Sequence, residues 1–306
     1  MIAIVVHGPD FASSENLTRV FKKWGDVNLI CINPSDWRRY DEGLLYDEHT
    51  EDKIHSVLDQ SDIIFLGDAT SLLCLAKTCP ALDWVNWCKS KTTIAYFGDS
   101  AYFKNPRFYD GLCEAMGVKR LFLLPNLMPL TSLSAVPLHH PMPVRWVDKD
   151  ENLSVAHAPG RDGKALQKGT EIIEIIVAEL QGNYEFDYKR LQYLTIKECL
   201  EIKNTAHIVI DQMPLNGVPY GMGRTGTEAL AVGSAVMTRM YDTSVLRGFF
   251  EPPPTLDIQN EKQLQEKLGI LLGNRDNLGK VQKESLAWAE EHVAFDKWLD
   301  YIGRYL

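Results

Sequence analysis

The stretch AHIVIDQMPLNGVPYGMGRTGTEALAVGSAVMT, residues 206–238, carries the pattern from which the fold can be predicted. It opens with an apolar run that ends near Asp211 and continues through a glycine-rich loop. A helical pattern then covers about residues 226–232, and a second apolar run starts at Ala235. Short apolar runs of this kind are typical of strands buried on both faces. Strand, helix and strand in this order predict a βαβ unit with a parallel sheet.

The same alternation surrounds this unit in the C-terminal half. Residues 153–157 are expected to form a strand, residues 170–180 an amphipathic helix and residues 188–194 a further strand. After the β-strand that starts at Ala235, the proline run 252–254 precedes two or three C-terminal helices. We therefore expect one complete α/β domain in this half.

The N-terminal half repeats the alternation, with predicted strands at residues 2–6, 27–32, 63–66, 93–97 and 120–124. Residues 126–143 contain four prolines and little periodicity, and we interpret them as a connection between domains that ends near Asp150. Asp148, Lys149 and Asp150 are expected to be solvated charges of this connection. The sequence thus predicts an α/β protein with two Rossmann-like domains, residues 1–143 and 144–306, that face each other across a cleft.

Composition and charge restrict the class of function. Lys and Arg number 32 and Asp and Glu 41, which gives a net charge of −9 and argues against non-specific binding of a polyanion. No apolar run approaches the ~20 residues of a membrane span, and the start lacks the features of a signal peptide. The six cysteines show no C-x-x-C spacing and are expected to be reduced. These features predict a cytoplasmic protein.

The glycine-rich loop, residues 216–226, is the first candidate site. Glycines allow a tight backbone turn, and a helix N-terminus attracts anions, so the loop is a candidate phosphate cradle. The alternative is an ordinary surface loop before a helix. Gly221, Gly223 and Gly226 also match G-x-G-x-x-G, with Asp242 downstream, which leaves a nicotinamide-dependent oxidoreductase open. The glycines do not follow the strand directly, however, as that fingerprint requires.

Polar residues after predicted strands are the other candidates. Arg161 and Lys168 follow the strand 153–157, where an anion would bind in an open α/β sheet, although a solvated basic loop is the alternative. Asp99 follows the strand 93–97, where it could meet a substrate hydroxyl or cap a turn. Gly8 occupies the same topological position after the first strand.

Taken together, the C-terminal half resembles GT-B glycosyltransferases, specifically the retaining family 4. The resemblance covers about residues 153–305 and is only architectural over the first 140. The matching motifs are H-x-P (His157, Pro159), K-G-T (Lys168, Gly169, Thr170), AHIVIDQ (206–212), Y-G (Tyr220, Gly221) and EALAVGSAV (228–236).

The resemblance implies roles for individual residues. Lys168, with Arg161 as its partner, would hold the diphosphate of a nucleotide sugar, and Glu228 would bind the ribose. The family's first glutamate falls on Tyr220, which is not an acid and leaves the sugar contact unassigned. The family's histidine after the fourth N-terminal strand falls on Phe97, two residues before Asp99. From its position after that strand, rather than from the resemblance, we expect Asp99 to orient or deprotonate the acceptor hydroxyl. The full predicted donor-binding set is Gly8, Lys168, Gly169, Tyr220, Gly221, Met222, Gly223 and Glu228, and the catalytic set is Asp99, Lys168 and Arg161.

The activity that this resemblance implies is transfer of a sugar from a nucleoside-diphosphate sugar, such as a UDP- or GDP-sugar, to an unidentified acceptor. Transfer would retain the anomeric configuration and need neither a metal nor a further cofactor. The last helices would cross back onto the N-terminal domain, which would select the acceptor; the net charge does not suggest a nucleic acid there. Two alternatives remain open: the oxidoreductase using the glycine loop, and a non-catalytic nucleotide-sugar-binding protein.

Overall fold

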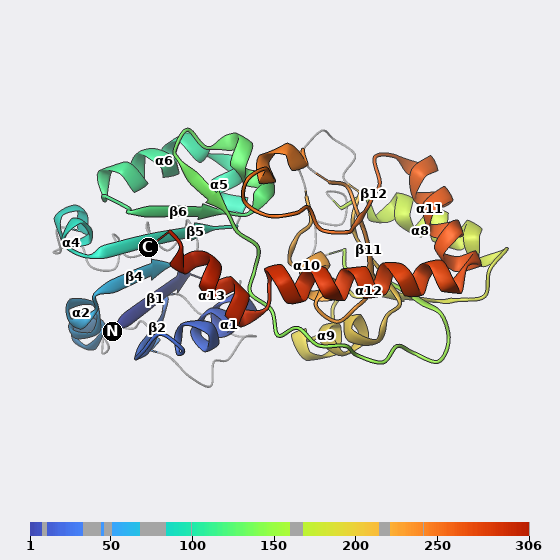
Figure 1. Ribbon diagram of the computed structural model, residues 1–306, viewed down its shortest axis with the longest axis horizontal. Coiled ribbons are helices and arrows are strands. Elements are labelled where there is room, and N and C mark those ends of the chain that lie inside the picture. Colours follow the sequence, from blue (N-terminus) through green and yellow to red (C-terminus); the bar gives the residue numbers. More distant parts are fainter. Residues whose placement is uncertain are drawn as a thin grey trace. The chain divides into compact units, whose positions relative to one another are not determined.

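The computed structural model describes residues 1–7, 11–32, 44–45, 51–67, 84–98, 100–159, 168–213, 221–240 and 242–305. The chain divides into two compact units. Unit 1 consists of Met1–Pro141 together with Trp298–Leu306, and unit 2 consists of Met142–Lys297. Figure 1 shows that each unit is built from a sheet and surrounding helices.

Unit 1 contains a parallel sheet of seven strands among its described residues, in the order β3-β2-β1-β4-β5-β6-β7. The inner strands are apolar on both faces, as in the successive residues Ile4 and Val5 of β1, which are both fully buried. The order of strands reverses between β1 and β4, as in a doubly wound fold. The strands are β1 Ile2–His7, β2 Val27–Ile32, β3 Leu44–Leu45, β4 Ile63–Leu66, β5 Thr92–Phe97, β6 Arg120–Leu123 and β7 Ala135–Pro137.

The core of unit 1 combines residues from both ends of the chain. Phe21 packs against Phe65 with ring centroids 4.9 Å apart and edge-on against Trp298 at 5.9 Å. The indole of Trp298 is buried and donates to the carbonyl of His139 at 2.7 Å. The helical elements are α1 Phe11–Phe21, α2 Glu51–Gln60, α4 Trp84–Ser90, α5 Ser100–Lys104, α6 Pro106–Ala115, the 3₁₀ helix η1 Pro125–Leu130 and, from Trp298 onward, α13 Phe295–Gly303.

The interpretation of residues 126–143 as a connection between domains is wrong for most of this stretch. Its first part forms η1 and its middle part forms β7, which pairs in parallel with β6 at the edge of the sheet. Proline is tolerated at such an edge because one side of an edge strand makes no ladder hydrogen bonds. The buried carboxylate of Asp110 accepts hydrogen bonds from Tyr102, Thr131 and Ser132 and anchors the segment to α6.

Unit 2 contains a second parallel sheet, with β12-β11-β10-β8-β9 as the order of its described strands. The strand order reverses between β8 and β10, and ligands of open α/β sheets bind beyond the carboxyl ends of the strands at such a reversal. The strands are β8 Ser154–His157, β9 Asp187–Arg190, β10 Ile208–Gln212, β11 Ala235–Thr238 and β12 Leu256–Asp257. The predicted alternation of strands and helices is thus confirmed in both units.

The unit 2 sheet is buried on both faces, as the continuous apolar runs predict. Along β10, Ile208 and Ile210 contribute to the core beside α8 and α11, and Val209 contributes to the core that contains residues of α10 and α12. Figure 1 shows the long helix α12 running beside α10 in this unit. The helical elements are α8 Thr170–Gln181, α9 Ile196–Thr205, α10 Arg224–Leu230, η2 Thr243–Leu246, α11 Glu261–Gly273 and α12 Arg275–His292.

The expectation that the charges at residues 148–150 are solvated is wrong for Lys149. The ammonium of Lys149 is largely buried and donates to the carbonyls of Asn204 and Val232 and to the hydroxyl of Ser234. Burial lowers the pKa of Lys149 to about 8. The lysine therefore binds the C-terminal ends of α9 and α10, which attract cations.

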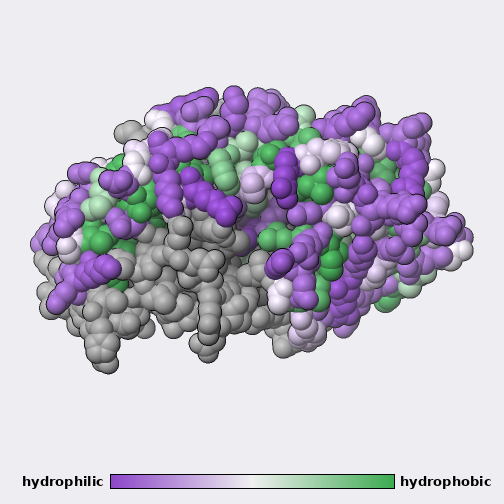
Figure 2. Space-filling model, turned by 90° about the horizontal axis from the view of Figure 1, so that it is seen from below, coloured by the Kyte–Doolittle hydropathy of each residue, from purple (hydrophilic) through white to green (hydrophobic). Residues whose placement is uncertain are grey.

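On the face drawn in Figure 2, hydrophilic residues cover most of the described surface, and hydrophobic residues appear between them as separate small patches. Among the described residues, no helix combines the length and the apolar character needed to cross a membrane. Cys88, Cys113 and Cys199 are free thiols. The two Rossmann-like sheets of the predicted fold class are present in the described residues.

Candidate functional site

Strands β8 and β10 are tied together at their carboxyl ends by a buried histidine. Nδ1 of His157 lies 2.8 Å from the carbonyl oxygen of Ile210, and Nε2 lies 2.9 Å from the hydroxyl of Thr170. Burial lowers the pKa of His157 to about 4, so the ring is neutral at pH 7. Because a carbonyl can only accept, Nδ1 carries the proton and Nε2 accepts from Thr170. His157 thereby fixes the first residue of α8.

The turn before α8 is fixed by its backbone. Gly169 has a φ of +70°, and a Cβ at this position would lie 2.1 Å from the carbonyl oxygen of Met213. The Met213 amide donates to the carbonyl of Lys168 at 2.9 Å. A glycine is required here because any side chain would clash with backbone and strain the left-handed conformation. The turn therefore places Lys168 at the end of β10.

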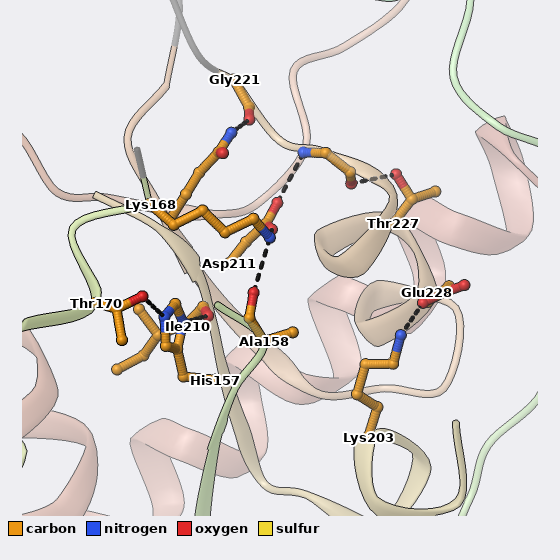
Figure 3. Close-up of polar contacts among 12 residues, drawn as sticks. His157, Ala158, Lys168, Thr170, Lys203, Ile210, Asp211, Gly221, Thr227 and Glu228 are labelled. Atoms are coloured by element: carbon orange, nitrogen blue, oxygen red, sulfur yellow. Dashed lines mark hydrogen bonds and ion pairs between the residues drawn. The ribbon is translucent and has the colours of Figure 1, made fainter. Parts of the chain in front are cut away.

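The side chain of Lys168 lies at this edge of the unit 2 sheet, beside Asp211 and Ala158 (Figure 3), and is partly exposed. Its ammonium donates to the carbonyl of Ala158 at 2.9 Å and to Oδ1 of Asp211 at 3.4 Å. An ammonium has three donors, and the third donates to no atom of the residues that the structure describes. With 21% of its side chain exposed, Lys168 has a donor that a ligand could use.

Asp211 is buried, with 1% of its side chain exposed, and it shapes the start of α10. Its Oδ2 accepts the Gly223 amide at 2.7 Å, and a Cβ at Gly223 or Gly226 would lie 3.3 or 3.1 Å from the same oxygen. The two glycines thus make room for a carboxylate of the protein itself. This packing is a different role from the close approach to pyrophosphate in a dinucleotide fingerprint.

Helix α10 begins at Arg224, two residues before its expected start at Gly226. Just before it, the carbonyl of Gly221 accepts from the side chain of Gln212. Met222, predicted to bind the donor, has a buried side chain that belongs to the hydrophobic core. Contact between Met222 and a ligand would therefore have to involve its backbone.

Glu228 is the fifth residue of α10, and so lies beyond the first turn of the helix, because the helix begins before Gly226. Its side chain is 9% exposed, Oε1 accepts from Arg224 at 2.7 Å, and Oε2 accepts from Lys203 of α9. Burial raises the pKa of Glu228, but the charges of Lys203 and Arg224 outweigh it and lower the pKa to about 2. Figure 3 shows the carboxylate directed toward Lys203 and away from Lys168.

Some of the predicted site residues lie close together near α10, and others are not described by the structure. The structure brings Lys168 and Gly169 close to the start of α10, through Asp211 and Met213, and places Glu228 one turn further along that helix. The remaining candidates lie outside the described residues: Gly8, Asp99, Arg161 and Tyr220.

Sequence reasoning missed three charged residues of this region. Asp211 could have been identified from the sequence. It ends an apolar strand and precedes a glycine-rich loop, so it has to lie at the edge of the sheet. Arg224 lies four residues before Glu228, the spacing of a helical ion pair. Lys203 had no such signal, because only the packing of α9 against α10 brings it to Glu228.

The sequence matches no protein-family model and no curated protein. Solved structures are nevertheless similar over nearly the whole chain. Anabaena HepE in complex with UDP and glucose shares 10% identity at a TM-score of 0.68, with 99% of each chain covered. An alpha-glucosyltransferase in complex with UDP-glucose and DNA containing an abasic site shares 11% identity at a TM-score of 0.64, with 99% of this chain and 98% of that one covered.

A third similar structure is sucrose-phosphate synthase from Thermosynechococcus elongatus, with 11% identity, a TM-score of 0.63, and 99% of this chain and 97% of that one covered. The two parallel sheets of the present chain, each with a reversal of strand order, agree with this likeness. The chain therefore has the GT-B fold of nucleotide-sugar glycosyltransferases.

Proposed function

We propose that this protein is a glycosyltransferase that moves a sugar from a nucleoside-diphosphate sugar to an acceptor, without a metal ion and with retention of anomeric configuration. The observation that carries the proposal is Lys168. Its ammonium lies at the strand-order reversal of the unit 2 sheet and is held by Ala158 and Asp211, and among the described residues its third donor has no acceptor. The similarity to structures that hold UDP or UDP-glucose supports a diphosphate as that ligand.

In this proposal the lysine acts on the leaving group. When the bond between the sugar and the diphosphate breaks, negative charge develops on the phosphate oxygens. A fixed ammonium stabilises this charge, and its two protein contacts mean that little reorganisation is needed during the reaction. Arg161, in the segment between Ala158 and Lys168, would supply a second cation. Two basic side chains would then do the work that a metal ion does elsewhere.

Glu228 is proposed to bind the ribose of the donor. Its oxygens accept from Lys203 and Arg224, but a carboxylate offers about four lone-pair positions, so acceptor capacity remains for hydroxyl groups. The two cations lower the pKa of Glu228 and keep it ionised, and an ionised carboxylate is the stronger acceptor. The 9% exposure of its side chain is the access that such a contact would use.

The acceptor would be bound by unit 1, with Asp99 after β5 to orient its hydroxyl group. The similar structures differ in what accompanies their nucleotide: glucose in one and DNA in another. We therefore propose no acceptor class, and Asp99 stays a proposal. Replacement of Asp99 by Asn is expected to lower transfer to acceptor and to leave donor affinity unchanged.

The test is a panel of UDP- and GDP-sugars scored for release of the nucleoside diphosphate, combined with thermal shifts in UDP, GDP and NAD. A ligand that binds the native state raises its stability. We expect a shift with one of the two nucleoside diphosphates, none with NAD, and release of that nucleotide from its sugar. Stabilisation by NAD alone would support the oxidoreductase, and binding without release would support a non-catalytic binder.

A further inference from the structure

Asp211 lies at an irregularity of the unit 2 sheet. Ile210 pairs with Met237 and Gln212 pairs with Thr238, the next residue of β11, so Asp211 between them has no partner in the ladder. Such a bulge is rare between parallel strands, and bulges near functional sites re-aim a side chain. Here the side chain is aimed at the start of α10, where it meets the amide of Gly223.

Among the described residues, the buried carboxylate accepts two hydrogen bonds, and each holds a different part of the candidate site. Oδ2 accepts from the Gly223 amide at 2.7 Å, and Oδ1 accepts from the ammonium of Lys168 at 3.4 Å (Figure 3). Removal of a carboxylate from water costs several kcal/mol unless it is paired. A buried acid in a region proposed to bind an anionic diphosphate therefore needs an explanation other than attraction of the ligand.

We propose that Asp211 is a positioning residue for Lys168. Together with the carbonyl of Ala158, it occupies two of the three donors of the ammonium and leaves the third for the diphosphate oxygen. Through Gly223 it also fixes the glycine loop relative to the same lysine. This inference rests on the proposed function, because it assigns a purpose to the orientation of Lys168.

The proposal predicts a separation of binding from catalysis. Replacement of Asp211 by Asn keeps an oxygen for the Gly223 amide but removes the negative charge beside Lys168. The ammonium then attracts a nucleoside diphosphate at least as strongly, yet its orientation is lost. We expect kcat to fall by about 10- to 100-fold, the scale of a small misplacement at a reacting centre, whereas the Kd for UDP or GDP stays the same or falls.

A double-variant comparison tests whether Asp211 acts through Lys168. In a Lys168→Ala background, Asp211→Asn is expected to lower kcat no further. The matched control is Asp257→Asn, which removes a carboxylate that accepts the Met240 amide at 2.8 Å at the end of β12. This control is expected to lower the thermal midpoint and leave kcat unchanged. Independent, multiplicative losses in the Asp211 and Lys168 variants would overturn the proposal, as would a wild-type kcat for Asp211→Asn.

A measurement on the wild-type protein covers the case in which Asp211→Asn does not fold. In a crystal structure with UDP or GDP, whichever the thermal shift selects, Lys168 is expected to keep its contacts to Asp211 and Ala158 while it donates to a phosphate oxygen. A lysine that leaves Asp211 to reach the phosphate would overturn the positioning role. Failure of the wild-type protein to bind either nucleotide would instead refute the proposed function on which this inference rests.

Discussion

Two lysine–carboxylate pairs lie beside α10, and they differ in how far the lysine is exposed to solvent. The side chain of Lys203 is buried, at 9% exposure, and its partner Glu228 has a second cation in Arg224. Lys168 pairs with Asp211, whose side chain is 1% exposed, but is itself 21% exposed, and its third donor meets no atom of the described residues. The same pair of chemical groups thus joins two helices in one place and presents a charge at a sheet edge in the other. Exposure of the cation, rather than burial of the acid, distinguishes them.

The largest expected effect comes from the buried pair. Replacement of Lys203 by Met leaves Glu228 buried with Arg224 as its remaining cation, and loss of one partner of a buried pair costs about 3–5 kcal/mol. We expect the free energy of unfolding, measured by urea denaturation, to fall toward that range. A loss within the scatter of surface ion pairs, below about 1 kcal/mol, would show that this pair does not hold α9 against α10.

For the pair of Lys168 and Asp211, we expect a large effect on turnover and a smaller effect on stability. Lys168→Ala should raise the barrier to donor turnover by about 2–4 kcal/mol, the cost of losing one preorganised charge-stabilising donor. Steady-state release of nucleotide from the active donor measures it. The loss of stability should be smaller than in Lys203→Met, because Asp211 keeps the Gly223 amide. Unchanged kcat/KM would remove Lys168 from the site.

A variant of Glu228 tests whether the buried pair of Lys203 and Glu228 also contacts the ligand. Glu228→Gln is expected to weaken binding of the nucleotide and the nucleotide sugar alike, by about 1.5–3 kcal/mol, the worth of hydrogen bonds to a charged group. Calorimetry with both ligands gives the two affinities. A lower thermal midpoint with unchanged nucleotide affinity would assign Glu228 to packing alone.

Acid pH is expected to lower the stability of the protein by a smaller amount, through protonation of His157, which joins β8 to β10. The pKa of His157 is about 4 in the folded protein, against 6.5 for an ordinary histidine. The unfolded chain therefore binds the proton first, and stability falls as the pH drops from 6.5 toward 4. At pH 5 the loss from this residue is about 2 kcal/mol. The variant His157→Asn, which can still donate to Ile210, should show a flatter pH dependence, and an identical slope would exclude His157 as the cause.

Periodicity was enough to predict most strands of the two sheets, but not the two-residue strands β3 and β12 or the strand β7. The apolar runs around Ile4 and Ile208 indicate strands buried on both faces, and this holds in each unit. Strand β7 was missed because its segment is proline-rich, and only the edge position that η1 and Asp110 secure makes it possible. The local sequence pattern contains no information on these tertiary contacts.

The parts of the candidate site that are set by residues close in sequence could be predicted. The position of Lys168 and Gly169 at the sheet edge is one of them, because these residues follow a strand and precede a helix. The start of α10 could not, because it depends on the Gly223 amide meeting Asp211, twelve residues earlier. The pairing of Glu228 with Lys203 of α9 likewise depends on how two helices pack.

The most direct test of the central claim is the affinity that a diphosphate adds to a nucleoside. Calorimetry would compare UDP with uridine and GDP with guanosine, in the wild-type protein and in Lys168→Ala. If Lys168 holds the diphosphate, the wild-type protein binds one nucleoside diphosphate far more tightly than its nucleoside, and the Lys168→Ala variant loses most of that advantage. An equal advantage in both proteins would contradict the account.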